Sequence, residues 1–527
     1  MGISLMLSRV LGFVRTFIIG LMFGQTDFTD AYTISFTLPD LIFYLVAGGA
    51  LSSAFIPVFT EYWSTDRKNE AWHIFSVVTT LMLILVTSIV TILWIFTPYI
   101  TPIIAAGKDP QLYPLISDMG RIILPCQIAF FIGGLMFATL YVRNVYEVGG
   151  LGPNIYNIGI IIGALVISNF VVPGVKGMSW GAVIGAFAGN IVVPFLVMRK
   201  MGSKFAFSLD LKHPGVVKVF KLMLPVLLGL SLPGIFSIIM RYFGGFYATG
   251  VNTALENANQ LMQAPLAIFG QSMALAIFPA LSAFYANNEM GKFREQMNRT
   301  MRTVIYLGVP SAAIMLAIPD FIIGGLLGHG KFGEEAIART SIALQMFAIG
   351  IPAWCLHPIL MRGYFSLQKS IPPIVMGTIA TAFFFAGSWV VTKIGFGFGS
   401  LPLVGSIAII LLVITMLVSL GKELKGLDYW GLASTFSQSA VSALVMAAFL
   451  WLSLNAHKWM GSPGGKIVSI ILLFFACLIG VWIYYFMSRV FKMPETAYLD
   501  RAMKKLQRGK PKSEEAATSE DKGPSAE

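Results

Sequence analysis

Apolar residues dominate most of the chain and come in blocks of about 20 or more, the length that a helix needs to cross a bilayer. Short polar connections separate these blocks. The pattern predicts an all-α polytopic membrane protein with about fourteen transmembrane helices. The predicted helices cover residues 1–23, 30–61, 73–99, 114–142, 152–171, 178–198, 217–241, 252–284, 300–327, 337–361, 372–392, 401–420, 429–455 and 465–488.

The order of the blocks suggests two lobes. Six predicted helices precede a polar connector, six follow it, and two more come after those. Two-lobed transporters are often built in this way, with the substrate site between the lobes. The end of the chain is rich in Lys, Glu, Ser and Pro, which predicts a disordered tail. The predicted boundaries are 1–198 for the first lobe, 199–216 for the cytoplasmic connector, 217–420 for the second lobe, 421–492 for the last two helices and 493–527 for the tail.

Basic residues are distributed unevenly over the connections. The chain is 56% hydrophobic and 12% charged, and its net charge is +12. If the N-terminus is cytoplasmic, most of the 37 Lys and Arg residues fall in cytoplasmic connections, as the positive-inside rule requires. The pattern predicts a multi-pass protein with both termini in the cytoplasm. Because topology explains the positive charge, no nucleic-acid partner is expected.

Motifs of soluble enzymes are incomplete in this chain. Residues 325–331 read GLLGHGK, which satisfies GxxxxGK, but Phe332 replaces the Ser or Thr that a phosphate-binding loop uses to hold magnesium. The three cysteines form no CxxC pair, and the five histidines show no ligand spacing. We therefore expect no catalytic residues, no metal and no cofactor. Without a nucleotide site, transport energy must come from an ion gradient, the membrane potential or the substrate's own gradient.

The first predicted helix carries a deeply placed arginine. Ser8, Gly12 and Arg15 share one helical face. Arg15 lies about 21 Å along a helix that begins at residue 1. A charge at this depth costs about 2.5–3.5 kcal/mol on insertion scales and normally faces protein or a water-filled cavity. Two readings follow: a cation that faces the substrate, or a structural ion pair with Asp30 or Asp40.

The eighth predicted helix carries a polar stripe. Its five polar residues fall within about 100° of one another on a helical wheel, and lipid cannot satisfy such a face. The stripe therefore lines a cavity or makes hydrogen bonds to another helix. Arg241, at the end of the seventh predicted helix, either sits at the outer interface or reaches the same cavity. The stripe consists of Asn252, Glu256, Asn259, Gln260 and Gln263.

Several segments resemble the MurJ/MviN family, a branch of an exporter superfamily that includes multidrug exporters and O-antigen flippases. They include SRVLGFVRT (8–16), GALSSAFIPVFTEY (49–62), GPNIYNIGIIIG (152–163), NANQLMQAPLAIFG (257–270) and RGYFSLQKSIPP (362–373). The resemblance implies fourteen helices, a V-shaped body of two six-helix lobes with two C-terminal helices, and a central cationic cavity. It also implies a bacterial cytoplasmic (inner) membrane location and lipid II as substrate, an undecaprenyl pyrophosphate that carries a disaccharide-pentapeptide.

The resemblance also assigns site residues and shows departures. Arg9, Arg15 and Asp30 fall where the family has essential first-lobe charges. Gln260 stands where the family usually has Arg, and Met240 stands where sodium-binding members have Asp. No sodium site is therefore expected. The substrate-binding residues predicted for the cavity are Arg9, Arg15, Asp30, Arg241, Glu256, Asn259 and Gln260.

These features predict a lipid II flippase that works by alternating access in cell-wall synthesis. It would not be an enzyme, and its partners would be lipid II, membrane lipids and, as candidates, cell-wall synthesis proteins. One alternative is a flippase for another undecaprenyl-linked glycan. A second is a drug/cation antiporter of the same superfamily, which needs acidic cavity residues. A third is a scaffold that recruits cell-wall enzymes through its tail.

Overall fold

The computed structural model describes residues 2–44, 50–145, 148–227, 232–459, 465–497 and 500. Within these ranges the chain is built of helices and contains no strand. The prediction of an all-α membrane fold is confirmed. The predicted tail, and with it the scaffold hypothesis, lies mostly outside the described residues.

The N-terminal bundle contains eleven α-helices among the described residues. A π-helical segment, Ala188–Val192, joins α9 to α10 so that the two form one continuous span. The helices are α1 (Gly2–Phe23), α2 (Asp27–Ser35), α3 (Thr37–Ile42), α4 (Ala50–Ser64), α5 (Lys68–Ile104), α6 (Tyr113–Ile123), α7 (Cys126–Val142), α8 (Leu151–Leu165), α9 (Lys176–Phe187), α10 (Val193–Lys200) and α11 (Pro214–Leu227).

The C-terminal bundle holds the remaining helices. Here a second π-helical segment, Leu266–Gln271, joins α13 to α14. The helices are α12 (Leu232–Gly244), α13 (Val251–Pro265), α14 (Ser272–Ala286), α15 (Met290–Ala317), α16 (Pro319–Leu326), α17 (Glu334–Ala348), α18 (Ile351–Ser366), α19 (Ile371–Ile394), α20 (Ser400–Glu423), α21 (Tyr429–Trp459) and α22 (Gly465–Val490).

The number of spans differs from the predicted count. In the described residues, 10 helices are long and apolar enough to cross a membrane, or up to 11 if the bent pair α17–α18 is one span. The count of fourteen is therefore not confirmed. The predicted helix 30–61 corresponds to three shorter helices, α2, α3 and α4, and the predicted helix 217–241 corresponds to α11 and α12. Apolar length alone does not show where a long apolar block divides.

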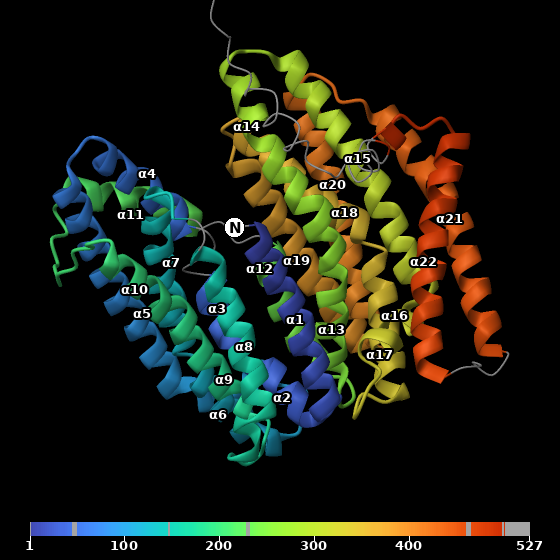
Figure 1. Ribbon diagram of the computed structural model, residues 1–527, viewed down its shortest axis with the longest axis horizontal. Helices are drawn as coiled ribbons and strands as arrows, with labels where there is room; N and C mark the ends of the chain where they lie inside the picture. The colour runs from blue at the N-terminus through green and yellow to red at the C-terminus, as the bar shows by residue number, and fades with distance from the viewer. Residues whose placement is uncertain are drawn as a thin grey trace, which may run out of the picture.

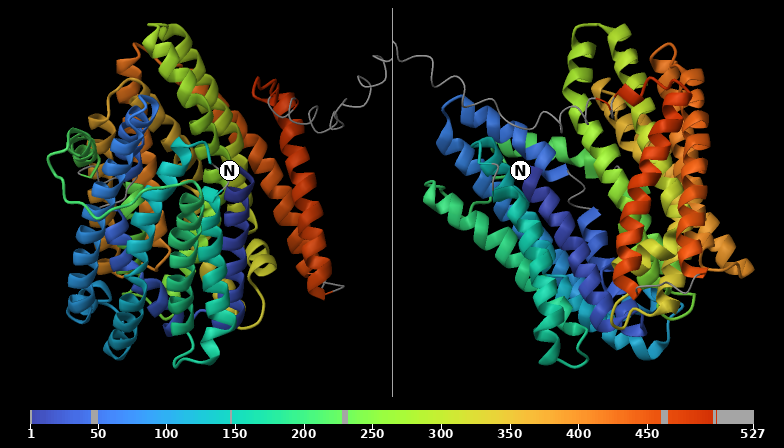
Figure 2. Two further views of the ribbon diagram at one scale, coloured as in Figure 1. Left: turned by 60° about the vertical axis from the view of Figure 1, so that its left-hand side comes forward. Right: turned by 45° about the vertical axis from the view of Figure 1, so that its right-hand side comes forward.

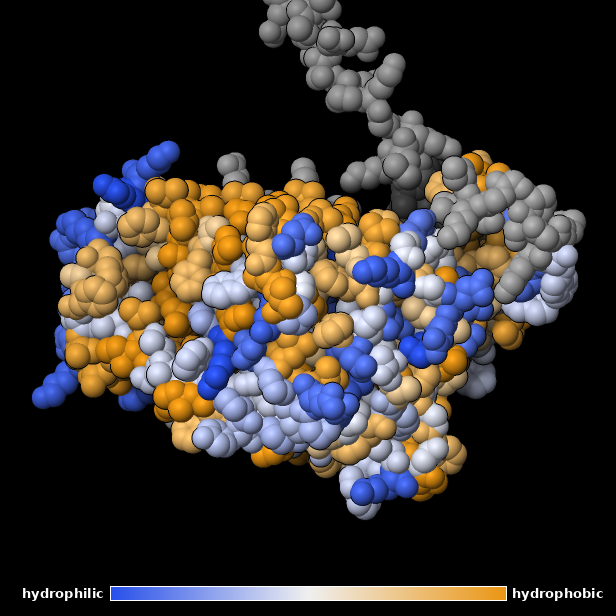
Figure 3. Space-filling view, turned by 90° about the horizontal axis from the view of Figure 1, so that it is seen from below, coloured by the Kyte–Doolittle hydropathy of each residue, from blue (hydrophilic) through white to orange (hydrophobic). Residues whose placement is uncertain are grey.

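The two bundles form a V, as predicted (Figures 1 and 2). They meet at the end where α2 and α17 lie, and they spread apart toward the end where α4, α14 and α15 lie (Figure 1). We call these the closed end and the open end. α1 lies between the bundles and packs on α8, whereas α21 and α22 cover the outer side of the second bundle (Figure 1). Figure 3 shows the closed end, where polar residues gather near the centre of the surface.

The helix α11 packs on the N-terminal bundle, although the predicted second lobe begins at residue 217. Val216, Val219 and Met223 belong to the buried core that α4 and α5 also form. A Cβ atom on Gly215 would lie 2.4 Å from the Ile74 side chain, so α11 begins in close contact with α5. The chain thus passes between the bundles after α11.

Close packing of α8 on α9 positions one side of the central site. A Cβ atom on Gly159 would lie 2.4 Å from the backbone oxygen of Gly181, so only glycine permits this approach. Small residues allow membrane helices to pack this tightly without a hydrophobic driving force. Asn157 lies about 200° around the helix from Gly159 and therefore faces α1 instead.

Candidate functional site: a polar cavity between the bundles

A cavity of about 220 Å³ lies where the two bundles meet. Both bundles contribute to its wall, α1, α2, α3 and α8 from one and α12 and α13 from the other. Its lining is mostly polar or aromatic. The lining residues are Arg15, Thr16, Ile19, Thr29, Tyr32, Thr33, Phe36, Asp40, Tyr156, Arg241, Thr253, Glu256, Asn257 and Gln260.

Arg15 enters the cavity from α1 and is oriented by an amide. Its Nη1 donates to Oδ1 of Asn157 on α8 over 3.1 Å. The Nδ2 of Asn157 donates to the backbone oxygens of Ser8 and Pro153, over 3.3 and 3.0 Å, which fixes the direction of the amide. No ion pair joins Arg15 to a carboxylate in the described part of the chain. The predicted alternative of a pair with Asp30 or Asp40 is therefore not formed.

Arg9 does not line the cavity. Its side chain is exposed, and its Nη2 lies 3.2 Å from Oε1 of Gln271, on the π-helical segment before α14. Arg9 is six residues from Arg15, about 9 Å along α1. The two arginines predicted to share the site thus lie at different depths, with Arg9 nearer the start of α1.

Arg241 links the two bundles inside the cavity. It is almost fully buried, and its Nη1 lies 2.6 Å from Oδ2 of Asp40 on α3. Its Nη2 lies 3.7 Å from Oε2 of Glu256, one helix further along the second bundle. Of the two predicted positions for Arg241, the structure therefore shows the one inside the cavity.

The lining is balanced in charge. Arg15 and Arg241 face Asp40 and Glu256, so the described wall holds two cations and two carboxylates. Arg241 is held between both carboxylates, whereas Arg15 contacts a neutral amide. The cationic cavity that the family resemblance implied is thus reduced here to one guanidinium without a carboxylate beside it.

The polar stripe of α13 divides into two pairs, and its fifth residue, Gln263, is exposed and lines neither space. Glu256 and Gln260 line the cavity, joined by Asn257, which lay outside the predicted stripe. Asn252 and Asn259 are buried behind Arg241, beside a void of about 10 Å³ that is large enough for about one water molecule. Thr16 on α1 donates a hydrogen bond to Oε1 of Gln260, which joins α1 to α13.

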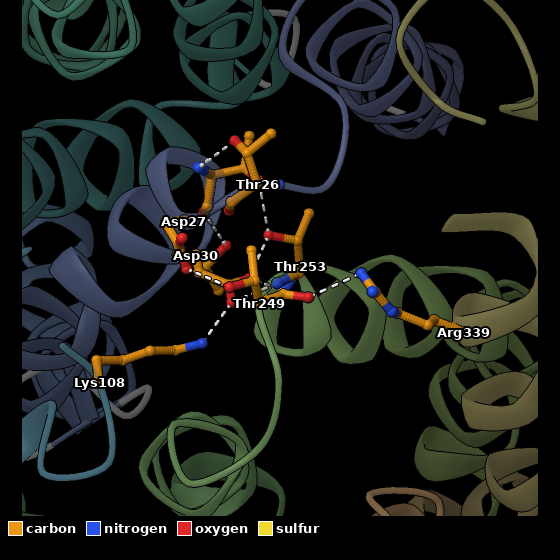
Figure 4. A network of polar contacts seen from close by, with 10 residues as sticks. Thr26, Asp27, Asp30, Lys108, Thr249, Thr253 and Arg339 are labelled. Carbon is orange, nitrogen blue, oxygen red and sulfur yellow. Dashed lines mark hydrogen bonds and ion pairs between the residues drawn. The ribbon is translucent and has the colours of Figure 1, made fainter. Parts of the chain in front are cut away.

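Asp30 lies at the closed end and is not part of the cavity wall. It is fully buried, and its Oδ2 lies 2.7 Å from Nζ of the buried Lys108 (Figure 4). The same oxygen accepts from the backbone N–H of Gly250 over 2.9 Å. Its Oδ1 accepts from the backbone N–H and the hydroxyl of Thr253, over 2.9 and 2.8 Å. Asp30 thus caps the N-terminus of α13, a helix of the other bundle.

Further hydrogen bonds tie the bundles together around Asp30. The Thr249 hydroxyl donates to Asp27 across the two bundles, and within the C-terminal bundle Arg339 donates to the backbone oxygen of Thr249 over 2.7 Å (Figure 4). Gln25 donates to Thr340 over 2.7 Å. Because Thr29 and Thr253 belong both to this network and to the cavity wall, the network closes one end of the cavity.

The GLLGHGK segment contributes to the same closure. The backbone N–H of Lys331 donates to the oxygen of Leu21, near the end of α1, over 3.1 Å. Gly24, at φ +67°, lies so close that a Cβ atom there would be 2.7 Å from the Lys331 oxygen. The segment thus docks on the end of α1.

Sequence reasoning missed three residues of this region. Lys108 stands in a predicted outer connection, and nothing in its neighbourhood indicates burial. Asn157 and Thr253 are neutral polar residues within predicted helices, and neither carries a charge or a helical spacing that would indicate a role. In the described residues no group of three or more His, Cys, Asp or Glu could hold a metal ion.

Comparisons with known proteins agree with this architecture. Two helical bundles with a polar cavity between them are the architecture of two-lobed membrane transporters, whose substrate site lies between the lobes. The family model "Lipid II flippase MurJ" matches residues 19–488, and the chain therefore belongs to the MurJ family, which confirms the resemblance.

Named relatives match over most of their length. The chain is 25% identical to "Lipid II flippase MurJ" of Burkholderia cenocepacia over 495 residues, 90% of this chain and 92% of the relative. It is 28% identical to "Probable lipid II flippase MurJ" of Vibrio cholerae over 389 residues, 71% of this chain and 73% of the relative.

Solved structures show the same fold. "Lipid II flippase MurJ, inward closed conformation" matches with a TM-score of 0.77 and 22% identity, over 93% of this chain and 98% of that one. An inward-facing multidrug transporter of the MATE family matches with a TM-score of 0.62 and 13% identity, over 78% and 98% of the two chains.

Proposed function

We propose that this protein flips lipid II across the bacterial cytoplasmic membrane by alternating access, for cell-wall synthesis. One observation carries the proposal: a polar and an apolar cavity lie side by side along the seam between α1 and α13. The apolar one has a volume of about 190 Å³. It shares Thr16, Asn257 and Gln260 with the polar cavity, and its other lining residues are Phe13, Val14, Phe17, Leu261, Leu326 and Leu327.

Paired polar and apolar spaces suit an amphiphilic substrate. A polar headgroup would occupy the cavity beside Arg15, while the first isoprene units of the lipid would lie along Phe13 and Phe17. The Thr16–Gln260 hydrogen bond marks the seam that a lipid must cross between these spaces. An antiporter for organic cations is less well supported, because Arg241 already pairs with the two cavity carboxylates.

Arg15 is the residue best placed to bind a pyrophosphate. A guanidinium presents donors in a planar fork that matches phosphate oxygens in a bidentate way. One Nη atom of Arg15 is used by Asn157, which leaves donors of the guanidinium for a ligand in the cavity. Glu256 and Gln260, on the opposite wall, would contact the neutral sugar and peptide groups.

The closed-end network supplies the gate that alternating access needs. With the N-terminus in the cytoplasm, the open end faces the cytoplasm and the Asp30 network faces the outside. The present arrangement is then the one that receives substrate from the inner leaflet. Release outside requires that Asp30 leave the N-terminus of α13. No covalent step is implied, so the protein would act as a transporter and not as an enzyme.

Complementation and a vesicle assay test the proposal together. The gene should restore growth to a bacterium depleted of its own lipid II flippase. Purified protein in vesicles should move fluorescent lipid II to the outer leaflet, where a membrane-impermeant reductant quenches it. An undecaprenyl-pyrophosphate-linked glycan without the peptide is the comparison substrate, because Gln260 replaces the usual family arginine. If only the comparison substrate moves, lipid II is the wrong cargo.

A further inference from the structure

The polar connector after α10 forms an extended segment at the outer edge of the N-terminal bundle (Figures 1 and 2). We call residues 203–211 the connector strap. Large apolar side chains stand at every second position in it: Phe205, Phe207, Leu209 and Leu211 are 46%, 74%, 61% and 59% exposed. In the extended part, residues 203–210, alternate residues share one face, whereas Leu211 lies in the turn that follows. Phe205 packs edge-on against Phe75 of α5, with 6.3 Å between the ring centroids. The strap therefore carries an apolar row of which the protein leaves Phe207 and Leu209 largely uncovered.

The opposite side of the strap is bound to α5. The backbone N–H groups of Ala206 and Ser208 donate to the hydroxyls of Ser76 and Thr80, over 3.2 and 3.5 Å. Asp210 then pairs with His73 over 3.2 Å, as the chain turns back along α5. These contacts hold one face of the strap against α5 and direct the apolar row outward.

The position of the strap along α5 indicates its depth relative to a bilayer. Large exposed apolar residues on α5 begin at Ile84 and continue to Ile103, about 29 Å along the helix axis. This length matches the roughly 30 Å of a hydrocarbon core. Thr80 lies four residues before Ile84, about 6 Å further out. The strap thus lies next to the edge of the apolar band, at the level of lipid headgroups.

Basic residues flank the strap. Arg199 and Lys200 precede the strap and Lys204 stands near its start, and the strap contains one acidic residue, Asp210, which pairs with His73. Basic residues beside a membrane surface attract anionic lipid headgroups. An extended backbone cannot enter the hydrocarbon core, because its N–H and C=O groups would lack partners there. Apolar side chains with a polar backbone therefore fit the interface and not the core.

We propose that the connector strap is a membrane-surface anchor. Its apolar row inserts between the headgroups of the adjacent leaflet, and the flanking basic residues bind anionic lipid phosphates. Because the strap is fixed to α5, the anchor holds the N-terminal bundle at a set depth. The connection to α11, and beyond it to the second bundle, then runs from a point that is fixed to the bilayer.

Spin labels at single cysteines test this proposal in the intact protein. Phe207→Cys and Leu209→Cys are labelled in a Cys477→Ser background, since Cys126 and Cys355 are buried. Lys212→Cys is the matched control at the end of the strap. In vesicles of phosphatidylethanolamine and phosphatidylglycerol, oxygen, which concentrates in lipid, should accelerate the spin relaxation of the labels at 207 and 209. A water-soluble nickel chelate should instead accelerate the spin relaxation of the label at 212.

Two outcomes would overturn the proposal. If the labels at 207 and 209 respond to the nickel chelate as strongly as the label at 212, the apolar row faces water and remains available to a soluble partner. If replacing phosphatidylglycerol with phosphatidylcholine leaves the depth of both labels unchanged, the basic residues do not bind anionic headgroups. A shallower position in the neutral lipid would support both parts of the proposal.

Discussion

The carboxylate of Asp30 on α2 accepts hydrogen bonds from both the backbone and the side chain of Thr253 on α13. The two residues belong to different bundles, so a side chain of one bundle serves as the helix cap of the other. A carboxylate at a helix N-terminus is stabilised by the free N–H groups and by the helix dipole. Separation of the bundles at this end must therefore break a charge-assisted contact.

Asp30→Asn should shift the protein toward the state that is open at this end. The amide keeps one acceptor for Thr253, but its NH₂ group cannot accept from Gly250. The loss of a charge-assisted hydrogen bond, about 1.5–3 kcal/mol, corresponds to a roughly 10- to 100-fold shift in the equilibrium. Thr33→Cys, in the cavity wall, reports the change through labelling of intact cells with an impermeant maleimide. Unchanged labelling would show that Asp30 does not hold this end closed.

Lys108→Met provides the companion measurement. It leaves Asp30 buried and without its cation, a change that costs about 3–5 kcal/mol in other buried pairs. The single variant should therefore unfold at a lower temperature than the double variant Asp30→Asn/Lys108→Met. If the unfolding temperature falls equally in both variants, the Asp30–Lys108 pair contributes only through the packing of its side chains and not through its charges.

Arg15→Ala should strongly slow transport while leaving nearly normal amounts of protein in the membrane. A half-buried guanidinium within a membrane helix is costly when it has no carboxylate partner, so its removal should not destabilise the fold. Loss of one charge-assisted phosphate contact predicts a roughly 10- to 100-fold lower rate in the vesicle assay. Arg15→Lys keeps the charge but loses the planar two-pronged donor geometry of a guanidinium. Its transport rate should therefore lie between those of the unmodified protein and of Arg15→Ala. Arg294→Ala, far from the cavity at the start of α15, serves as the control. A normal rate in Arg15→Ala would exclude Arg15 as the phosphate contact.

Gln260→Arg should be tolerated and should tighten precursor binding. Gln260 is half-buried in the cavity wall, and Glu256 lies one helical turn away, so a new cation gains a partner. The variant loses the acceptor for Thr16, which is a small cost beside a second phosphate contact. Binding of lipid II to the purified protein measures the gain. If the variant no longer reaches the membrane, this face of α13 has no room for a larger side chain.

Lys331→Cys should react with an impermeant maleimide in intact cells, and Lys292→Cys should react only after the membrane is opened. Both lysines are exposed in the structure, Lys331 at the closed end and Lys292 at the start of α15 at the open end. A difference in labelling between the two cysteines therefore reports the side of the membrane on which each one lies. The reverse labelling pattern would contradict the cytoplasmic placement of the N-terminus that the basic residues predict. The open end would then face the outside of the cell.

The sequence by itself determined the features that belong to single helices. Apolar length indicated the membrane fold, and the position of Arg15 within an apolar block indicated a protein-facing or water-facing charge. Helical periodicity placed Glu256 and Gln260 on one face of α13, and both line the cavity. These inferences need only the geometry of one helix, which is the same in every protein.

Only the tertiary structure decided which side chains meet. The sequence allowed Arg15 to pair with Asp30 or Asp40, but Asp30 contacts Lys108 and α13, and Asp40 contacts Arg241. Several pairings satisfy the same charges, and the choice depends on how helices far apart in the chain cross. The stripe of α13 divided for the same reason, since α12 covers Asn252 and Asn259 and leaves Glu256 and Gln260 at the cavity. A helical wheel shows which residues share a face, but the neighbouring helices determine what that face contacts.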